Sequence, residues 1–299
     1  MKKTYLTFVI VLVAVFLILF FLGQRSEYAA EKALWKINQQ MMEVGKDPNI
    51  VPDVTFLKIH RQYKEFTRKH AKSKLAPVAN ILSARIFILK KDFDKAREIL
   101  EEVVEIYKDE PDIAVQAVSE IALTYQQQQS FLKMVDVFKR MKNEYPTTEL
   151  GFLAPLRIGQ FYASQNELTQ AQRYFNEAIE HYNNLIAQNA DDQQVVFNAM
   201  RSKAVCYMGQ EQWQNAVDIF GEVLLKFAES ELLTGAKAER IIKSINTISM
   251  VNIKSYEMPI KIYTQFIEKY PQHQFVPSLA KMKDSFVLLE KEKAIIEIK

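Results

Sequence analysis

The sequence predicts an all-α fold, in which one transmembrane helix precedes an α-solenoid of antiparallel helix pairs. Three observations support this prediction. A fixed spacing of small and aromatic residues recurs five times along the chain. The segments on either side of these copies carry apolar residues three and four positions apart, which is the spacing of one helix face. An apolar stretch near the N-terminus is long enough to cross a bilayer.

The N-terminal stretch, residues 1–25, is predicted to be a membrane anchor. Lys2 and Lys3 precede residues 5–22, which are apolar apart from Thr7. Residues 4–23 as a helix would span a bilayer core of about 30 Å at ~1.5 Å per residue. Because the lysines should stay in the cytoplasm, the rest of the chain is expected outside it. In a bacterium, this would make a single-pass protein of the inner membrane, with its N-terminus cytoplasmic and its repeats periplasmic or otherwise extracytoplasmic.

A cleaved signal peptide, which would leave a soluble periplasmic protein, is the alternative to this anchor. The two lysines and the apolar run are typical of a membrane anchor and of a signal peptide alike. The run is longer than a usual signal core, however, and no small-x-small cleavage site follows it. The best candidate, Ala30, has Tyr28 two places before it. These features favour the anchor.

Residues 26–76 are predicted to form a divergent first helix pair that caps the array. Ser26 is expected to cap a helix that runs to about Val44, and Asp53 to cap the second helix. The second helix and the residues after it carry a membrane-proximal basic patch, which consists of Lys58, Arg61, Lys64, Arg68 and Lys72. This patch is either a solvated helix face or a surface for anionic headgroups, which attract each such cation by about 1 kcal/mol. An acidic partner protein would fit it equally well.

Residues 77–272 contain the five copies of the repeat. In one copy, Gly159 is followed by Tyr162, Ala171, Phe175 and Ala178. On two antiparallel helices, the small residues would let the backbones approach, and the larger ones would fill the seam beside the crossing. The same spacing occurs in four other sets: Ala84, Phe87, Ala96, Leu100, Val103; Ala122, Tyr125, Met134, Phe138, Met141; Ala204, Tyr207, Ala216, Phe220, Val223; and, degraded, Thr247, Met250, Pro259, Tyr263, Phe266.

With these copies, and with Pro146 and Pro271 closing two of them, the chain resembles the tetratricopeptide repeat (TPR) family, whose period is about 34 residues. Here the first small residues are 38, 37, 45 and 43 residues apart. Longer units closed by Tyr-Pro, as at Tyr145 and Tyr270, are similar to the BamD-like and Tol-Pal-associated TPR proteins of the bacterial envelope. The chain departs from the lipoproteins of that group, because no lipobox cysteine follows its apolar stretch.

Residues 273–299 are predicted to be a C-terminal capping helix that begins near Pro277. Terminal repeats need one face that can meet water. Apolar residues recur at helical spacing at Phe275, Leu279, Met282, Phe286 and Leu289.

The residues offer little for catalysis, and we expect no enzyme activity, catalytic residue, metal or cofactor. Cys206 is the single cysteine and is expected to be buried and inert. The four histidines have no metal-ligating companion three or four residues away. A net charge of +3 favours no nucleic-acid role.

The resemblance to TPR proteins implies where a partner would bind. In that family, the residues three before and one after the first small residue point into a groove lined by the first helices. Here these positions hold Ile81, Arg85, Ser119, Leu123, Leu156, Gln160, Arg201, Val205, Ser244 and Ile248. Two arginines among mixed apolar and polar residues suit an extended peptide or a helix with an acidic residue. The apolar members could instead pack against neighbouring repeats.

These observations favour a membrane-tethered scaffold or adaptor that binds a protein or peptide partner in the cell envelope, during assembly, secretion or quality control. The alternative is a structural TPR protein that assembles with copies of itself at the membrane, so a homo-oligomer is possible.

Overall fold

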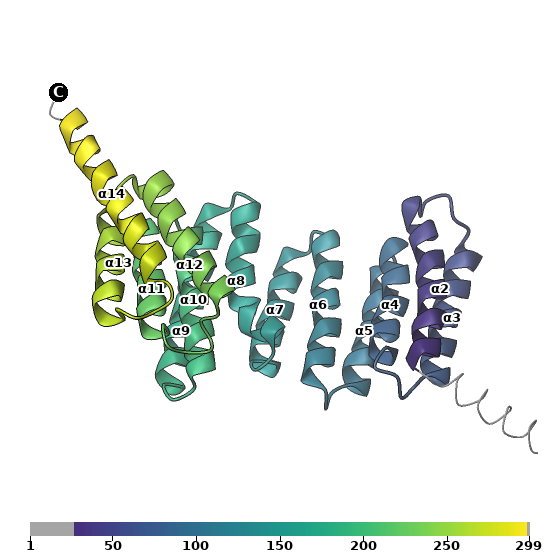
Figure 1. Ribbon diagram of the computed structural model, residues 1–299. Coiled ribbons are helices and arrows are strands. Elements are labelled where there is room, and N and C mark those ends of the chain that lie inside the picture. Colours follow the sequence, from purple (N-terminus) through teal and green to yellow (C-terminus); the bar gives the residue numbers. More distant parts are fainter. Residues whose placement is uncertain (1–26, 298–299) are drawn as a thin grey trace, which may run out of the picture. The chain divides into compact units, whose positions relative to one another are not determined.

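The computed structural model describes residues 27–297, with side chains through residue 293. This part contains thirteen α-helices, one π-helical segment and no strand (Figure 1), which confirms the predicted all-α class. The predicted membrane span at residues 5–22 and the cap at Ser26 lie outside the described residues. Within residues 27–297, no helix has the length and apolar character that crossing a membrane requires.

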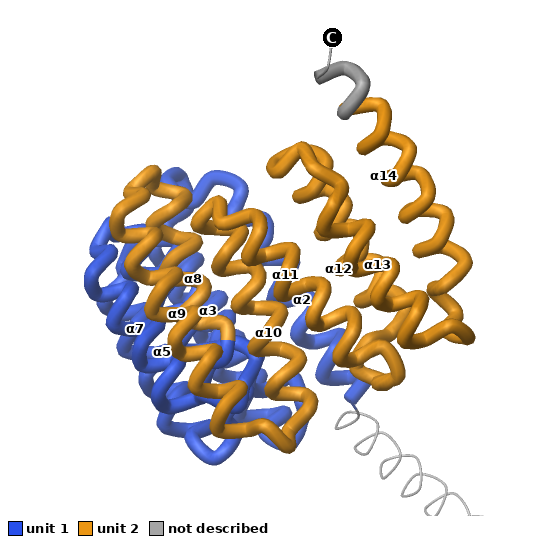
Figure 2. Tube along the Cα trace, turned by 90° about the vertical axis from the view of Figure 1, so that its left-hand side faces the viewer, with its two compact units in different colours: residues 1–152 blue, residues 153–299 orange. Residues whose placement is uncertain are grey.

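The chain divides into two compact units, residues 1–152 and 153–299, with the boundary inside α8 (Figure 2). Before α8 (Glu149–Ser164), unit 1 contains α2 (Glu27–Lys46), α3 (Asp53–Lys69), α4 (Ala76–Leu89), α5 (Phe93–Ile106), α6 (Pro111–Gln127) and α7 (Phe131–Glu144). After α8, unit 2 contains α9 (Leu168–Gln188), α10 (Gln193–Gly209), α11 (Trp213–Lys226), α12 (Gly235–Thr247), the π-helix η1 (Ile248–Ile253), α13 (Glu257–Lys269) and α14 (Val276–Glu297).

In the first four copies the small residues lie at the helix crossings, as predicted, whereas Thr247 of the fifth copy is exposed. Ala84, Ala122 and Ala204 are buried on the first helices of their pairs, and Ala96 and Ala216 are buried on the second helices. Neighbouring helices such as α4 and α5, or α10 and α11, pack against one another. The recurring spacing therefore marks the points where two helix backbones come close.

A second regularity of the repeat lies in the turns within the helix pairs. One residue in each turn has a left-handed backbone, and in every copy it is seven places after the first small residue. These residues are Lys91, Gln129, Asn166, Glu211 and Lys254, with φ between 56° and 61°. No glycine occupies any of the five positions. The shared turn confirms the register of all five copies, including the degraded fifth.

The fifth copy departs from the others in its first helix. After Thr247 the helix widens into η1, and Met250 is 45% exposed. The prediction that Met250 fills the seam is therefore wrong, because the π-helical turn rotates the positions after Thr247 relative to a regular α-helix. The second helix of this copy behaves as predicted, with Tyr263 and Phe266 fully buried.

The first helix pair and the last helix differ from the predictions in detail. Asp53 does not cap α3, because the N-cap residue is Pro52 and Asp53 already belongs to the helix. Its carboxylate instead lies 2.8 Å from Nζ of Lys90. In α14, Leu279 and Phe286 are buried, whereas Leu289 lies on the exposed side.

Candidate partner-binding surface

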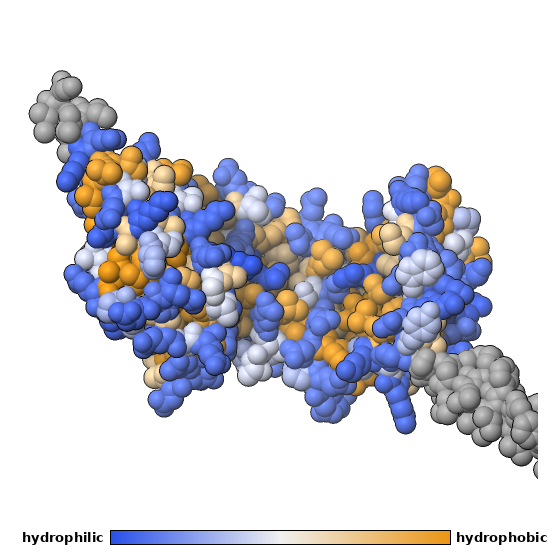
Figure 3. All heavy atoms as spheres, in the orientation of Figure 1, coloured by the Kyte–Doolittle hydropathy of each residue, from blue (hydrophilic) through white to orange (hydrophobic). Residues whose placement is uncertain are grey.

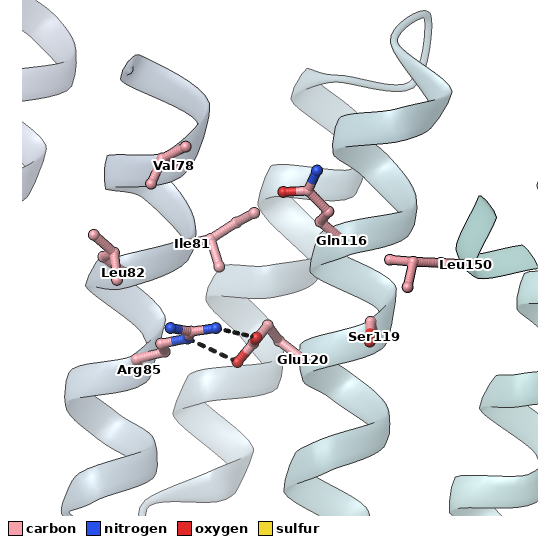
Figure 4. Close-up of a pocket in the computed structure, with 8 residues that line it drawn as sticks. All are labelled: Val78, Ile81, Leu82, Arg85, Gln116, Ser119, Glu120 and Leu150. Carbon is pink, nitrogen blue, oxygen red and sulfur yellow. Dashed lines mark hydrogen bonds and ion pairs between the residues drawn. The ribbon is translucent and has the colours of Figure 1, made fainter. Parts of the chain in front are cut away.

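In unit 1, a groove lies between α4, α6 and the start of α8 (Figure 4). It has a volume of about 210 Å³ and is lined by Val78, Ile81, Leu82, Arg85, Gln116, Ser119, Glu120 and Leu150. Apolar patches lie among hydrophilic side chains on the face of this unit that Figure 3 shows. The structure thus brings together three of the predicted groove residues, Ile81, Arg85 and Ser119. Leu123, one turn further along α6, is exposed but does not line the groove.

The arginine of this groove already has an acidic partner within the chain. Nε and Nη2 of Arg85 donate to the two carboxylate oxygens of Glu120, at 3.0 and 2.5 Å, from one first helix to the next. These bonds to Glu120 raise the pKa of Arg85 above its usual value. The charge of Arg85 is therefore compensated without a partner molecule, and the groove offers mainly apolar and neutral contacts.

In unit 2, the predicted groove residues fall into two groups. Leu156 and Ile248 are buried, as Ile81 is in unit 1, so these apolar residues serve mainly in packing between helices. Gln160 is exposed, and Arg201, Val205 and Ser244 are half-buried. The hydroxyl of Ser244 donates to the carbonyl of Arg240 one turn earlier on the same helix.

Arg201 lies in a group of positive charges that we call the Arg201 cluster: Arg201 on α10 with Lys237 and Arg240 on α12. The guanidinium carbon of Arg201 and Nζ of Lys237 are each 5.3 Å from the ring centre of Phe197, which is fully buried. Burial and, next, the charge of Arg240 lower the pKa of Arg201 below the usual arginine value. Among the residues that the structure describes, no carboxylate pairs with any member of the cluster.

Other partly buried arginines of the chain differ in this respect. Arg140 lies 2.7 Å from a carboxylate oxygen of Glu101 and 2.9 Å from one of Glu144. Arg97 pairs with Asp94 and also donates to Gln128. Since a half-buried cation with cationic neighbours is unfavourable, the Arg201 cluster is suited to receive an anionic group from another molecule.

The predicted basic patch is exposed along α3 and just beyond its end. Lys58, Arg61, Lys64, Arg68 and Lys72 all face solvent. Lys64 forms an ion pair with Glu102, in which its Nζ lies 3.3 Å from a carboxylate oxygen. The exposed apolar residues Val54 and Leu57, which the sequence analysis did not single out, lie near the start of the same helix.

The groups that could support catalysis are embedded in the fold. Cys206 is fully buried, and burial raises the pKa of its thiol to about 12, so it remains protonated at neutral pH. The ring of His273 contacts the backbone oxygen of Ala228 at 3.0 Å, and His60 contacts that of Ser83 at 3.4 Å. Within the described residues, no group of three His, Cys, Asp or Glu side chains could hold a metal ion.

The sequence analysis missed Phe197, Lys237 and Arg240 as parts of the surface. The repeat pattern assigns only two groove positions to each first helix, and these three residues lie outside them. A signal was available in α12, where Lys237, Arg240 and Lys243 accompany a single acidic residue, Glu239.

Comparison with known proteins gives a family match over part of the chain. The family model of the tetratricopeptide repeat matches residues 78–110 and 156–184. No curated protein matches the chain. Among solved structures, the TPR2AB domain of yeast Sti1 in complex with pHSP90 is 12% identical, with a TM-score of 0.34, and the alignment covers 86% of this chain and 98% of that one. BtubC (BKLC) from P. vanneervenii is 13% identical, with a TM-score of 0.37 and coverage of 90% and 92%. By the family match and the repeated crossings, this chain contains tetratricopeptide repeats in both of its units.

Proposed function

We propose that this chain is a membrane-tethered scaffold of the bacterial cell envelope, whose first helices bind a segment of a partner protein that carries acidic residues. TPR arrays present extended surfaces formed by successive repeats, and such surfaces suit elongated partners. The scaffold would hold its partner near the membrane during assembly, secretion or quality control. Residues 5–22 would supply the tether.

The Arg201 cluster is the observation that carries this proposal. Arg201, Lys237 and Arg240 converge from two first helices, and no carboxylate of the described chain compensates them. A carboxylate from a partner would form charge-assisted hydrogen bonds, which contribute about 1.5–3 kcal/mol each. It would also relieve the repulsion between Arg201 and Arg240. We therefore expect the acidic residue of the partner to bind the Arg201 cluster of unit 2, because Arg85 of unit 1 is already paired with Glu120.

In-cell photocrosslinking of the full-length protein tests this proposal. A photoreactive amino acid in place of half-buried Val205, beside the Arg201 cluster, should capture a protein whose contacting peptide is acidic. The same amino acid in place of exposed Asp136, on the second helix α7, serves as the control. Capture of lipid alone at Val205, or equal capture at both positions, would contradict the proposal.

Charge variants make the same experiment specific. Arg201→Gln and Arg240→Gln should each reduce capture at Val205 about tenfold, which corresponds to the loss of one charge-assisted hydrogen bond. Arg173→Gln removes an exposed arginine of α9 that already pairs with Glu177, and capture should not change. Equal losses in all three variants would indicate a nonspecific charge effect.

The membrane and the compartment require a separate measurement. If residues 5–22 anchor the chain, the protein should stay in the membrane pellet after alkaline carbonate washing. An externally added protease should digest it in spheroplasts but not in intact cells. Release of a shortened chain into the periplasm would instead support the cleaved signal peptide.

Self-assembly is the second candidate function, and exposed residues of α2 favour it. Tyr28, Trp35 and Met42 follow one another at intervals of seven, and they are 72%, 60% and 64% exposed. Exposed apolar ridges of this kind are found at protein interfaces. If α2 pairs with a second copy, light scattering of the full-length protein should show growth with concentration. Trp35→Glu should abolish this growth, whereas Lys36→Gln, at an exposed position about 100° away around the helix, should not.

A further inference from the structure

The second helix α9 is longer than its counterparts in the other repeats. It has 21 residues, whereas α5, α7 and α11 have 14 each and α13 has 13. The additional turns explain why Gly159 and Ala204 are 45 residues apart. Packing of the repeat does not require them, since the other second helices end without such an extension.

The extension forms one wall of a pocket in unit 2. Ile186, near the end of α9, faces Met200 of α10 and two residues of α11, Ile219 and Leu225, across a space of about 580 Å³. Met200 and Ile219 are buried, and Ile186 and Leu225 are half-buried. Ligand sites in proteins have volumes of about 300–1,000 Å³ and are mostly apolar. The floor of this pocket therefore fits an apolar side chain.

The charged residues around this floor are mostly positive. Lys203 of α10, Lys226 of α11 and Lys269 of α13 line the pocket, with Glu222 as the one acidic lining residue. In the described part of the chain, none of these four side chains forms an ion pair. Among the residues that line the pocket, three lysines and one glutamate leave an excess of two positive charges. The lysines come from three helices, so the positive charge is spread along the pocket.

This pocket is separate from the Arg201 cluster. On a helix of 3.6 residues per turn, Lys203 and Arg201 of α10 are about 200° apart. The cluster involves α10 and α12, whereas the pocket lies between α9, α10, α11 and α13.

We propose that the pocket beneath the α9 extension is a second docking site, which takes an apolar side chain flanked by carboxylates on a segment of a partner protein. The apolar side chain enters between Ile186 and Leu225, and the carboxylates lie against Lys203, Lys226 and Lys269. A segment with several carboxylates matches lysines on three helices better than a ligand with one anionic head group. The proposal concerns a surface outside the first-helix groove.

Binding of labelled hexapeptides to the full-length protein tests this site. A peptide of alternating glutamate and leucine should bind, as measured by fluorescence anisotropy. Peptides of alternating glutamate and serine, or lysine and leucine, should bind at least tenfold more weakly. Lys203→Gln and Lys269→Gln should each weaken binding about threefold, as expected for partly exposed ion pairs. Lys243→Gln and Lys261→Gln, which remove exposed lysines outside the pocket, should have no effect.

Two further measurements identify the site. Ile186→Glu places a carboxylate in the pocket and should abolish binding. If this variant does not fold, Lys203→Gln and Lys269→Gln still test whether the peptide binds in this pocket. A photoreactive leucine analogue in the peptide should crosslink to α9, α10 or α11. Equal binding of the glutamate–serine peptide would overturn the proposal. So would loss of binding in Arg201→Gln without any loss in Lys203→Gln, which would place the peptide at the Arg201 cluster instead.

Discussion

Phe175 of α9 occupies the space that a Cβ atom on Gly159 of α8 would need. A Cβ built on Gly159 would lie 2.5 Å from Cδ1 of the Phe175 ring. The opposite edge of the same ring lies against Gly209 of α10, where a Cβ would also overlap it. One buried aromatic ring is thus held between glycines of two successive first helices, and it sets how closely they approach.

Gly159→Ala should therefore destabilise the protein, although alanine is favoured over glycine within a helix. Its Cβ would overlap a ring that is itself fully buried and that lies against Gly209 on its other edge. Overpacking of this kind costs about 1–3 kcal/mol, which exceeds the gain of up to about 1 kcal/mol from helix propensity. Urea unfolding of the full-length protein, followed by circular dichroism, measures the difference.

Two variants control this experiment. Gly235→Ala should not destabilise the protein, because no atom lies within 4 Å of its Cβ position. Combining Gly159→Ala with Phe175→Leu should recover part of the loss, since the smaller side chain makes room for the methyl group. If Gly159→Ala is as stable as Gly235→Ala, the crossing is looser than described.

The left-handed turn residues give a second prediction. Gln129→Gly should stabilise the protein by about 1 kcal/mol, because a residue with a Cβ atom is strained at its φ of 56° and glycine is not. The adjacent Gln128 has a φ of −80°, so Gln128→Gly should destabilise the protein by at least about 0.5–1 kcal/mol, since it also removes the hydrogen bond that Gln128 accepts from Arg97. The urea midpoints of the two variants should move in opposite directions, and a shift in the same direction would contradict the assignment of the turn.

The sequence predicted these crossings because each depends on local spacing. Ala84, Ala122 and Ala204 are buried wherever the spacing placed them. The widening of η1 could not be predicted, since no proline or glycine lies within residues 248–253 to indicate an irregular helix. The N-cap of α3 was also mispredicted by one residue, because Pro52 and not Asp53 takes that position.

The candidate surface was less predictable, because it depends on which side chains meet between repeats. The pairing of Arg85 with Glu120 joins residues 35 positions apart and depends on the distance between α4 and α6. Arg201 was predicted to face the groove, but the absence of a carboxylate around it, within the described residues, follows only from the structure. Sequence spacing therefore indicates where a surface lies, and not whether its charges are already compensated.

The ion pair of unit 1 gives a third prediction. Arg85→Gln should destabilise the protein more than Glu120→Gln, because the Glu120 side chain is only 13% exposed and would lose its partner, whereas that of Arg85 is 47% exposed. A double-mutant cycle should give a coupling of about 1 kcal/mol, at the upper end for exposed pairs because the contact is bidentate.

The exposed pair of Arg173 and Glu177, four residues apart on α9, provides the comparison for this cycle. Its coupling should be about 0.3–0.5 kcal/mol. In 1 M salt, the coupling of the exposed pair should fall more than that of Arg85 with Glu120, because exposed charges are screened more. Equal coupling energies for the two pairs, both at low salt and in 1 M salt, would show that the bidentate contact adds nothing in solution.

The buried thiol of Cys206 gives a fourth prediction, about alkaline pH. Burial raises its pKa from 9.0 to about 12, so the folded chain keeps a proton that the unfolded chain loses above pH 9. The unfolded state then binds fewer protons than the folded state, and the free energy of unfolding decreases as pH rises through this range. The contribution of the thiol is fully present below pH 9 and is lost between pH 9 and about pH 12.

Cys206→Ala removes this titration and should make the unfolding free energy less dependent on pH between about pH 8.5 and 10. The variant is expected to be less stable at pH 7 because it leaves a small cavity, so the measured quantity is the slope with pH and not the stability itself. Above pH 10 the buried tyrosines add a decrease of the same sign, since burial raises the pKa of Tyr63 from 10.0 to about 12. Urea unfolding at several pH values below 10 isolates the thiol. Equal slopes for the two proteins would show that Cys206 reaches solvent in the folded chain.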